Sequence, residues 1–276
     1  MALLQVNYVS RALMRTVTLH VVLPVDKFAS EHTPYRPARA FPTLYLLHGL
    51  LGNYTDWVTG TRVQRWAEAR DLAVVMPSGD NHFYVDQPGT HDLYGEFIGR
   101  ELVEITRRMF PLSPRREDTF IGGLSMGGYG ALRNGLKYHD TFGAIAALST
   151  ANIVAHMDGF TDDAPNFNNR TSYLEGLFGP RAGIPGSDAD LTALAHKLRG
   201  LPDEQPRIYL ACGDADDLLG LNVQLRDELR ADGFAVTWRQ APGGHEWDFW
   251  DSQIRQVIDW LPLAGGESGI NSGHIR

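Results

Sequence analysis

Side chains that could act together in nucleophilic catalysis stand directly after apolar runs of the sequence. Ser125 follows TFIGGL, a cluster of aspartates follows RIYLAC, and His245 follows FAVTWRQAPGG. A serine hydroxyl is a weak nucleophile at neutral pH, so a neighbouring base must accept its proton and a third group must orient that base. A serine, an acid and a histidine therefore predict attack on a carbonyl carbon, provided that the fold brings the three runs together.

The serine lies in Gly123-Leu124-Ser125-Met126-Gly127, which fits the pattern G-x-S-x-G. In that pattern a strained turn between a strand and a helix lifts the hydroxyl clear of a sheet. The glycines on either side let neighbouring elements pass where a Cβ would collide. A phosphate-binding loop, the other glycine-rich possibility, needs G-x-x-x-x-G-K-[ST], and the sequence does not contain it.

The acid cannot be chosen by spacing, because Asp214, Asp216 and Asp217 all follow the same run. Of the ten histidines, His245 alone combines a late strand end, flanking glycines and a following helix. His48 is the main rival, but it precedes the serine, whereas the order in α/β hydrolases is serine, acid, histidine. We expect His48 to support a neighbouring loop through side-chain hydrogen bonds.

Negative charge that develops on a carbonyl oxygen needs donors that are already in place, and losing one costs about 3 kcal/mol of barrier. The backbone N–H of Met126, at the helix start, is one expected donor. The second comes from the loop after the first buried strand, which predicts the N–H of Leu50.

The elements that must position these residues alternate in type along the chain. Apolar and β-branched runs predict strands at 4–10, 15–24, 43–49, 72–77, 118–125, 142–149, 207–213 and 234–240, and amphipathic runs predict helices at 96–110, 128–139, 221–233 and 247–261. This rhythm predicts an α/β fold with a mostly parallel sheet of about eight strands, helices on both faces, and the first two strands antiparallel to the rest. We expect one domain over 1–262, a cap-like insertion at about 152–206 and a disordered tail at 263–276.

Composition excludes several classes of protein. The 276 residues carry a net charge of -8 and no dense basic run, which argues against nucleic-acid binding. No apolar run has the length of a membrane span or of a signal peptide. One cysteine excludes an internal disulfide, and a cytoplasmic location is the simplest expectation. No metal-binding motif is present, and we expect neither a metal nor a cofactor.

The segments LYLLHGLLGNYTDW, LAVVMPSGDNHFYVD, FIGGLSMGGYGAL, CGDADDLL and GGHEWDFW together resemble the esterase D family of α/β hydrolases, and the small bacterial tributyrin esterases most of all. The likeness runs from about Gln5 to Pro262. It implies the α/β-hydrolase fold, and its C-G-x-x-D-x-L pattern selects Asp216 as the acid. Position by position, it also implies Ser125 as the nucleophile, His245 as the base, and the N–H groups of Leu50 and Met126 as oxyanion donors. It further implies pocket positions at His48, Gly49 and Trp57. For Trp57 a packing role is an equal alternative.

The function that the resemblance implies is a cytoplasmic serine carboxylesterase. It would hydrolyse short-chain acyl esters through an acyl-enzyme, with a small-molecule ester as its partner and with self-association possible. An S-formylglutathione hydrolase or a feruloyl or aryl esterase on the same residues is the first alternative. A hydrolase scaffold kept only as a binding module is the second.

Overall fold

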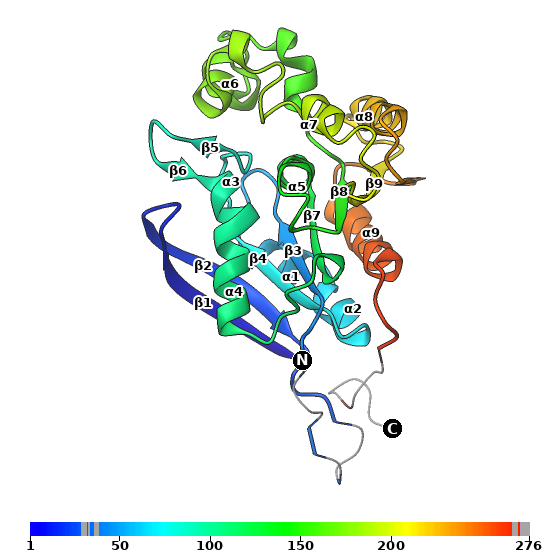
Figure 1. Cartoon of the computed structure of the whole chain (residues 1–276). Coiled ribbons are helices and arrows are strands. Elements are labelled where there is room, and N and C mark those ends of the chain that lie inside the picture. The colour runs from blue at the N-terminus through cyan, green and yellow to red at the C-terminus, as the bar shows by residue number, and fades with distance from the viewer. Residues whose placement is uncertain (29–31, 33, 36–38, 267–269, 271–276) are drawn as a thin grey trace.

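A computed structural model describes residues 1–28, 32, 34, 35, 39–266 and 270. Its centre is an eight-stranded sheet in the order β1-β2-β4-β3-β7-β8-β9-β10 (Figure 1). All pairs from β4 to β10 are parallel, and β2 pairs antiparallel with both β1 and β4. The strands are β1 (Ala2–Ser10), β2 (Arg15–Leu23), β3 (Thr43–Leu47), β4 (Ala73–Pro77), β7 (Thr119–Leu124), β8 (Ala144–Leu148), β9 (Arg207–Gly213) and β10 (Val236–Ala241).

The mostly parallel α/β sheet is confirmed, with one correction. We expected both leading strands to run antiparallel to the rest, but only β2 does. The two strands form a hairpin, and the strands of a hairpin must run in opposite directions. Once β2 opposes β4, β1 must share the direction of the parallel set.

Helices cover both faces of the sheet (Figure 1). Side chains alternate across a strand, so in β3 Tyr45 and Leu47 join one apolar cluster while Leu44 and Leu46 join the other. The first cluster includes buried residues of α4, α5, α7 and α8, and the second those of α2 and α9. The helices are α1 (Asp56–Gly60), α2 (Val63–Ala69), α3 (Tyr94–Glu96), α4 (Leu102–Met109), α5 (Met126–Lys137), α6 (Thr171–Phe178), α7 (Leu191–Lys197), α8 (Leu219–Ala231) and α9 (Trp247–Trp260).

The helix expected at 96–110 is divided. Between α3 and α4 the residues Phe97–Glu101 form a π-helical turn. Gly99 lies in this turn, and a Cβ there would come within 2.1 Å of the Tyr138 ring. The sequence analysis also missed α1, α2 and a short antiparallel pair, β5 (Asp86–Gln87) and β6 (Asp92–Leu93), because elements this short leave no periodic pattern.

Residues 152–206 form a helical segment that stands above the sheet at the top of Figure 1. It contains α6, α7 and three 3-10 helices, Ile153–Gly159, Phe167–Asn169 and Arg181–Gly183. The Tyr129 hydroxyl of α5 donates to Ala189 O at 2.5 Å, and Gln87 Nε2 of β5 donates to Gly176 O at 3.0 Å. These bonds fasten the insertion to the body of the molecule.

Of the predicted tail at 263–276, residues 263–266 and 270 are described, and the remainder lies outside the described residues. Leu263 packs against the second apolar cluster. Within the described ranges, no helix has both the length and the apolar character that crossing a membrane requires.

Candidate active site

Three side chains meet at the carboxyl ends of the strands, where an open α/β sheet binds its ligands. Ser125 follows β7, Asp216 lies in the loop after β9, and His245 lies in the loop after β10. His245 Nε2 is 3.0 Å from Ser125 Oγ, and His245 Nδ1 is 3.0 Å from Asp216 Oδ2. The fold therefore joins these three side chains in one continuous chain of hydrogen bonds.

The backbone at Ser125 is strained, as the motif predicts. Its φ of 54° and ψ of -117° lie outside the regions that L-residues prefer. The Ser125 N–H donates to Leu148 O at 2.9 Å, which fixes the turn to β8. A Cβ at Gly123 would lie 2.3 Å from Gly127 O, and one at Gly127 would lie 2.4 Å from Leu47 O. The two glycines are thus needed because backbone passes too close for a side chain.

Asp216 is distinguished from its two neighbours by burial and by its partners. Its side chain is 0% exposed, whereas Asp214 and Asp217 are exposed. Asp216 Oδ2 faces His245, and Oδ1 accepts the Leu218 N–H at 2.9 Å. Burial opposes ionisation, but hydrogen bonds from His245, the Leu218 N–H and the Ser149 hydroxyl outweigh it and hold the pKa of Asp216 below its usual value. The carboxyl group is therefore an anion at neutral pH.

This charge fixes the roles of the two His245 nitrogens. A carboxylate only accepts hydrogen bonds, so Nδ1 carries the proton that faces Asp216. In the neutral ring Nε2 is then the acceptor for the Ser125 hydroxyl. The edge-on ring of Trp250, 4.9 Å away, packs against His245, and Trp250 Nε1 donates to Ser149 Oγ at 3.2 Å. The imidazole is thus oriented to accept a proton from the serine.

Two backbone amides, those of Met126 and Leu50, are the predicted donors to an oxyanion. Met126 is the first residue of α5, so its N–H has no acceptor within the helix. Leu50 lies in the loop of residues 48–54, here called the oxyanion loop. A Cβ at Gly49 would lie 3.5 Å from Ser125 Cβ, so this loop passes directly over the serine turn. Among the described residues, neither N–H donates to a protein acceptor.

His48 holds the oxyanion loop from inside the fold. The Gly79 N–H donates to His48 Nε2 at 2.8 Å, so the ring proton is on Nδ1, which donates to Gly49 O at 2.6 Å. In a trans peptide the C=O and the following N–H point in opposite directions. Fixing Gly49 O therefore turns the Leu50 N–H away from His48. Burial lowers the pKa of His48, which favours this neutral form.

The pocket positions implied by the family resemblance differ in their surroundings. Gly49 borders the serine turn, but the side chains of His48 and Trp57 are each only 1% exposed. Trp57 Nε1 donates to Leu47 O at 3.0 Å, and its ring packs edge-on against Trp247 at 5.7 Å. These contacts support the packing role that the sequence left open for Trp57.

Comparison with known proteins agrees with this geometry. A family model described as "Putative esterase" matches residues 10–261. The chain belongs to this esterase family. An acetyl esterase of Caldicellulosiruptor saccharolyticus is 42% identical to it over 261 residues, which cover 95% of this chain and 98% of that protein. The chain is therefore an enzyme, an ester hydrolase of the α/β-hydrolase fold.

Two solved structures similar to the esterase are hydrolases. The fluorophosphonate-binding serine hydrolase F of Staphylococcus aureus superposes with a TM-score of 0.81 at 29% identity, covering 94% of this chain and 98% of that one. An S-formylglutathione hydrolase of the same organism superposes with a TM-score of 0.78 at 30% identity, with the same shares covered. Both likenesses extend over nearly the whole esterase.

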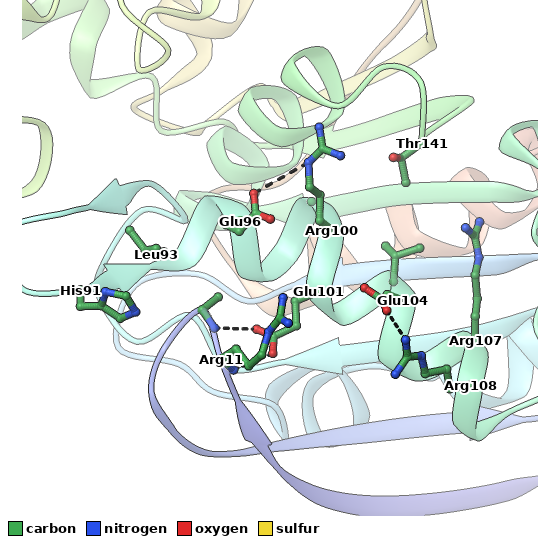
Figure 2. Close-up of a pocket in the computed structure, with 13 residues that line it drawn as sticks. Arg11, His91, Leu93, Glu96, Arg100, Glu101, Glu104, Arg107, Arg108 and Thr141 are labelled. Carbon is green, nitrogen blue, oxygen red and sulfur yellow. Dashed lines mark hydrogen bonds and ion pairs between the residues drawn. The ribbon is translucent and has the colours of Figure 1, made fainter.

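A hollow away from these three side chains has a different character. It has a volume of about 770 Å³ and lies along α3 and α4 (Figure 2). Its charged side chains pair with one another, as Arg100 does with Glu96 at 3.8 Å and Arg108 with Glu104 at 2.5 Å. None of its lining residues is a serine or a cysteine. It offers a surface that carries ion pairs.

Two residues beside the site were missed by the sequence analysis, although a signal for each was present. Ser149 directly follows β8, and its hydroxyl bonds to Asp216. Asn81 lies four residues after β4, and its Oδ1 accepts the Leu51 N–H of the oxyanion loop at 2.8 Å. Both follow buried parallel strands, and the same strand-end rule pointed to Ser125, the aspartate cluster and His245.

Proposed function

We propose that the esterase hydrolyses short-chain acyl esters, acetyl esters first among them, with Ser125 as nucleophile, His245 as base and Asp216 as the acid that orients it. The unbroken Ser125–His245–Asp216 chain of hydrogen bonds, with both contacts at 3.0 Å, carries the proposal. The acetyl esterase at 42% identity supports the choice of acyl group. The S-formylglutathione hydrolase at 30% identity supports the thioester alternative less strongly.

The reaction follows from the proton positions. Ser125 Oγ bonds to the ester carbonyl carbon as its proton moves to His245 Nε2, and the carbonyl oxygen takes the negative charge. The N–H groups of Leu50 and Met126 stabilise that oxyanion. When the tetrahedral intermediate collapses, the bond to the alcohol oxygen breaks, and His245 gives its proton to the departing alcohol.

Water then completes the cycle. His245 Nε2 takes a proton from water as the water oxygen bonds to the acyl carbon. Collapse of this second intermediate breaks the bond to Ser125 Oγ, which regains its proton from His245. The carboxylic acid leaves, and the proposed reaction uses only ester and water. A cytoplasmic location and self-association remain predictions from the sequence.

The test is an ester panel on wild type and Ser125→Ala. We expect wild type to hydrolyse p-nitrophenyl acetate faster than the butyrate and the octanoate, and faster than S-formylglutathione or methyl ferulate. Ser125→Ala should lose roughly 10⁴-fold or more in kcat. Ser252→Ala is the matched control, because that exposed hydroxyl on α9 donates to Phe249 O at 2.7 Å and accepts from Gln253 Nε2 at 3.4 Å, both on its own helix.

Each departure from this result has its own meaning. A rate dominated by the thioester or by the ferulate would replace the acetyl preference with that alternative. Unchanged turnover in Ser125→Ala would refute the assignment of the nucleophile. A wild type that neither turns over the panel nor reacts with a fluorophosphonate would favour the binding-module alternative.

A further inference from the structure

The oxyanion loop is held by a second loop, residues 78–84, which we call the support loop. Besides the bond from Gly79 to His48 described above, the Tyr54 N–H donates to Ser78 Oγ at 3.1 Å. The Tyr84 hydroxyl donates to His48 O at 2.9 Å. The fourth bond joins the Leu51 N–H to Asn81 Oδ1 at 2.8 Å. These contacts attach the oxyanion loop to the support loop along most of its length.

The bond from Leu51 differs from the others because Leu51 is strained and unburied. Its φ is 67°, a conformation that an L-residue adopts only when its surroundings hold it there, and its side chain is 77% exposed. Side-chain packing therefore cannot supply the restraint. The bond to Asn81 acts directly on the Leu51 N–H and restrains this backbone conformation.

Leu50 lies between two restrained peptide groups. On one side His48 Nδ1 holds Gly49 O, and on the other side Asn81 Oδ1 holds the Leu51 N–H. The Leu50 N–H lies in the Gly49–Leu50 peptide plane, and the bond to the Leu51 N–H restrains the next plane, which limits how far the first can rotate. Releasing the Leu51 side would leave the Gly49–Leu50 plane, and the Leu50 N–H in it, freer to rotate.

Asn81 is itself attached to the insertion. The Tyr173 hydroxyl of α6 donates to Asn81 O at 3.0 Å. Burial raises the pKa of Tyr173 to about 12, so the hydroxyl keeps its proton and remains a donor at neutral pH. On the other side Asp80 bonds to Arg15 at 2.6 Å and to the Tyr94 hydroxyl at 2.5 Å. The position of Asn81 is thus set from both the insertion and the sheet.

We propose that Asn81 is a positioning residue for the oxyanion hole and that Tyr173 links it to the insertion. The proposal rests on the proposed function, because it assumes that the Leu50 N–H receives the oxyanion. Asn81 stabilises the transition state only through Leu50. Its loss should therefore lower kcat while the KM of a small ester changes little.

The experiment compares Asn81→Ala and Tyr173→Phe with matched controls in the full chain. Asn7→Ala also removes an accepted side-chain bond, from Thr18 at 2.6 Å, but on the outer strand β1. Tyr138→Phe also removes a tyrosine donor, to Glu96 at 3.4 Å. For each variant we would measure kcat and KM with p-nitrophenyl acetate, with active sites titrated by a fluorophosphonate. The Ki of a methyl trifluoromethyl ketone, which forms a tetrahedral adduct with a serine, would report the oxyanion hole itself.

For Asn81→Ala we expect kcat to fall roughly 10- to 100-fold, the ketone Ki to rise by a similar factor, and KM to stay within about threefold. Tyr173→Phe should show the same pattern at roughly two- to fivefold, and it serves as the test if Asn81→Ala does not fold. Asn81→Asp keeps an acceptor oxygen but adds negative charge near the oxyanion, so its kcat should lie between those of Asn81→Ala and wild type. Both controls should match wild type.

Two results would overturn the proposal. One is a kcat of Asn81→Ala within about twofold of wild type, which is far below the loss expected from a displaced oxyanion donor. The other is a fall in kcat without a rise in the ketone Ki. Either result leaves the proposed function standing as long as Ser125→Ala is inactive. An active Ser125→Ala would instead refute the proposed function.

Discussion

Replacing Asp216 by asparagine tests the assignment of the acid with almost no change in shape. Besides the Ser149 hydroxyl, the Asp216 carboxylate accepts the Leu218 N–H at 2.9 Å and His245 Nδ1 at 3.0 Å. An asparagine has one acceptor oxygen and one amide group that donates. The Leu218 N–H is a fixed donor, so it claims the oxygen and leaves the amide N–H facing His245.

The consequence is a change of tautomer at His245. Facing a donor, Nδ1 must give up its proton and become an acceptor, and in the neutral ring the proton then lies on Nε2. An Nε2 that carries a proton cannot accept one from the Ser125 hydroxyl. We expect Asp216→Asn to lower kcat by about 10⁴, which corresponds to about 5.5 kcal/mol of barrier.

The other two aspartates supply matched controls. Asp214 Oδ1 accepts the Gly243 N–H at 3.2 Å, a bond that an asparagine oxygen can keep, and both Asp214 and Asp217 are exposed. Hydrolysis of p-nitrophenyl acetate at neutral pH by the three asparagine variants, with folding checked by circular dichroism, measures the effect. Asp214→Asn and Asp217→Asn should stay within about threefold of wild type, as surface changes usually do. A loss in Asp217→Asn as large as that in Asp216→Asn, or an Asp216→Asn that keeps a tenth of wild-type activity, would refute this reasoning.

Two predictions concern stability. Gly127→Ala places a Cβ 2.4 Å from Leu47 O and 2.5 Å from His48 O, so urea denaturation should show a loss of about 1–3 kcal/mol. Gly220→Ala, on α8 with no atom within 4 Å of the new Cβ, should instead gain about 0.5–1 kcal/mol, and equal effects would contradict the close approach. Burial lowers the pKa of His48, so below about pH 6.5 the unfolded chain binds a proton that the folded chain does not. As the pH falls below that value, the free energy of unfolding should therefore decrease by up to about 1.4 kcal/mol per pH unit. His48→Asn should flatten that slope between about pH 7 and pH 5, and a slope equal to that of wild type would exclude His48 as its source.

The sheet could be predicted from the sequence because its central strands are buried on both faces. β3, β4, β7 and β8 have no exposed residue, so each reads as an uninterrupted apolar run between turns. The predicted direction of β1 was wrong, because alternating half-exposed residues indicate that a segment is a paired strand but not which way that strand runs. The π-helical turn was missed because the amphipathic pattern runs on through it, and the close approach of the Tyr138 ring to Gly99 in that turn joins positions far apart in the chain.

The site was predictable to the extent that it depends on strand ends. That rule placed Ser125, the aspartate cluster and His245 at one edge of the sheet, and the structure brings three of these side chains within hydrogen-bond distance. It could not choose among three aspartates within four residues, because the choice depends on which carboxylate turns inward. The roles of these residues in catalysis remain predictions.

The residues that support the oxyanion loop could not be predicted from sequence spacing either, but for a different reason. A nucleophile carries its own chemistry, so its residue type identifies it, whereas Asn81 matters only because its oxygen meets the Leu51 N–H across two loops. An asparagine in a turn is common, and nothing in its local sequence reveals a partner 30 residues away. The insertion then adds a second dependence, since Tyr173 holds Asn81 from a segment that follows β8. If Asn81 positions the Leu50 N–H as proposed, we expect changes in that segment that move Tyr173 to alter the chemical step without touching any residue that contacts the ester.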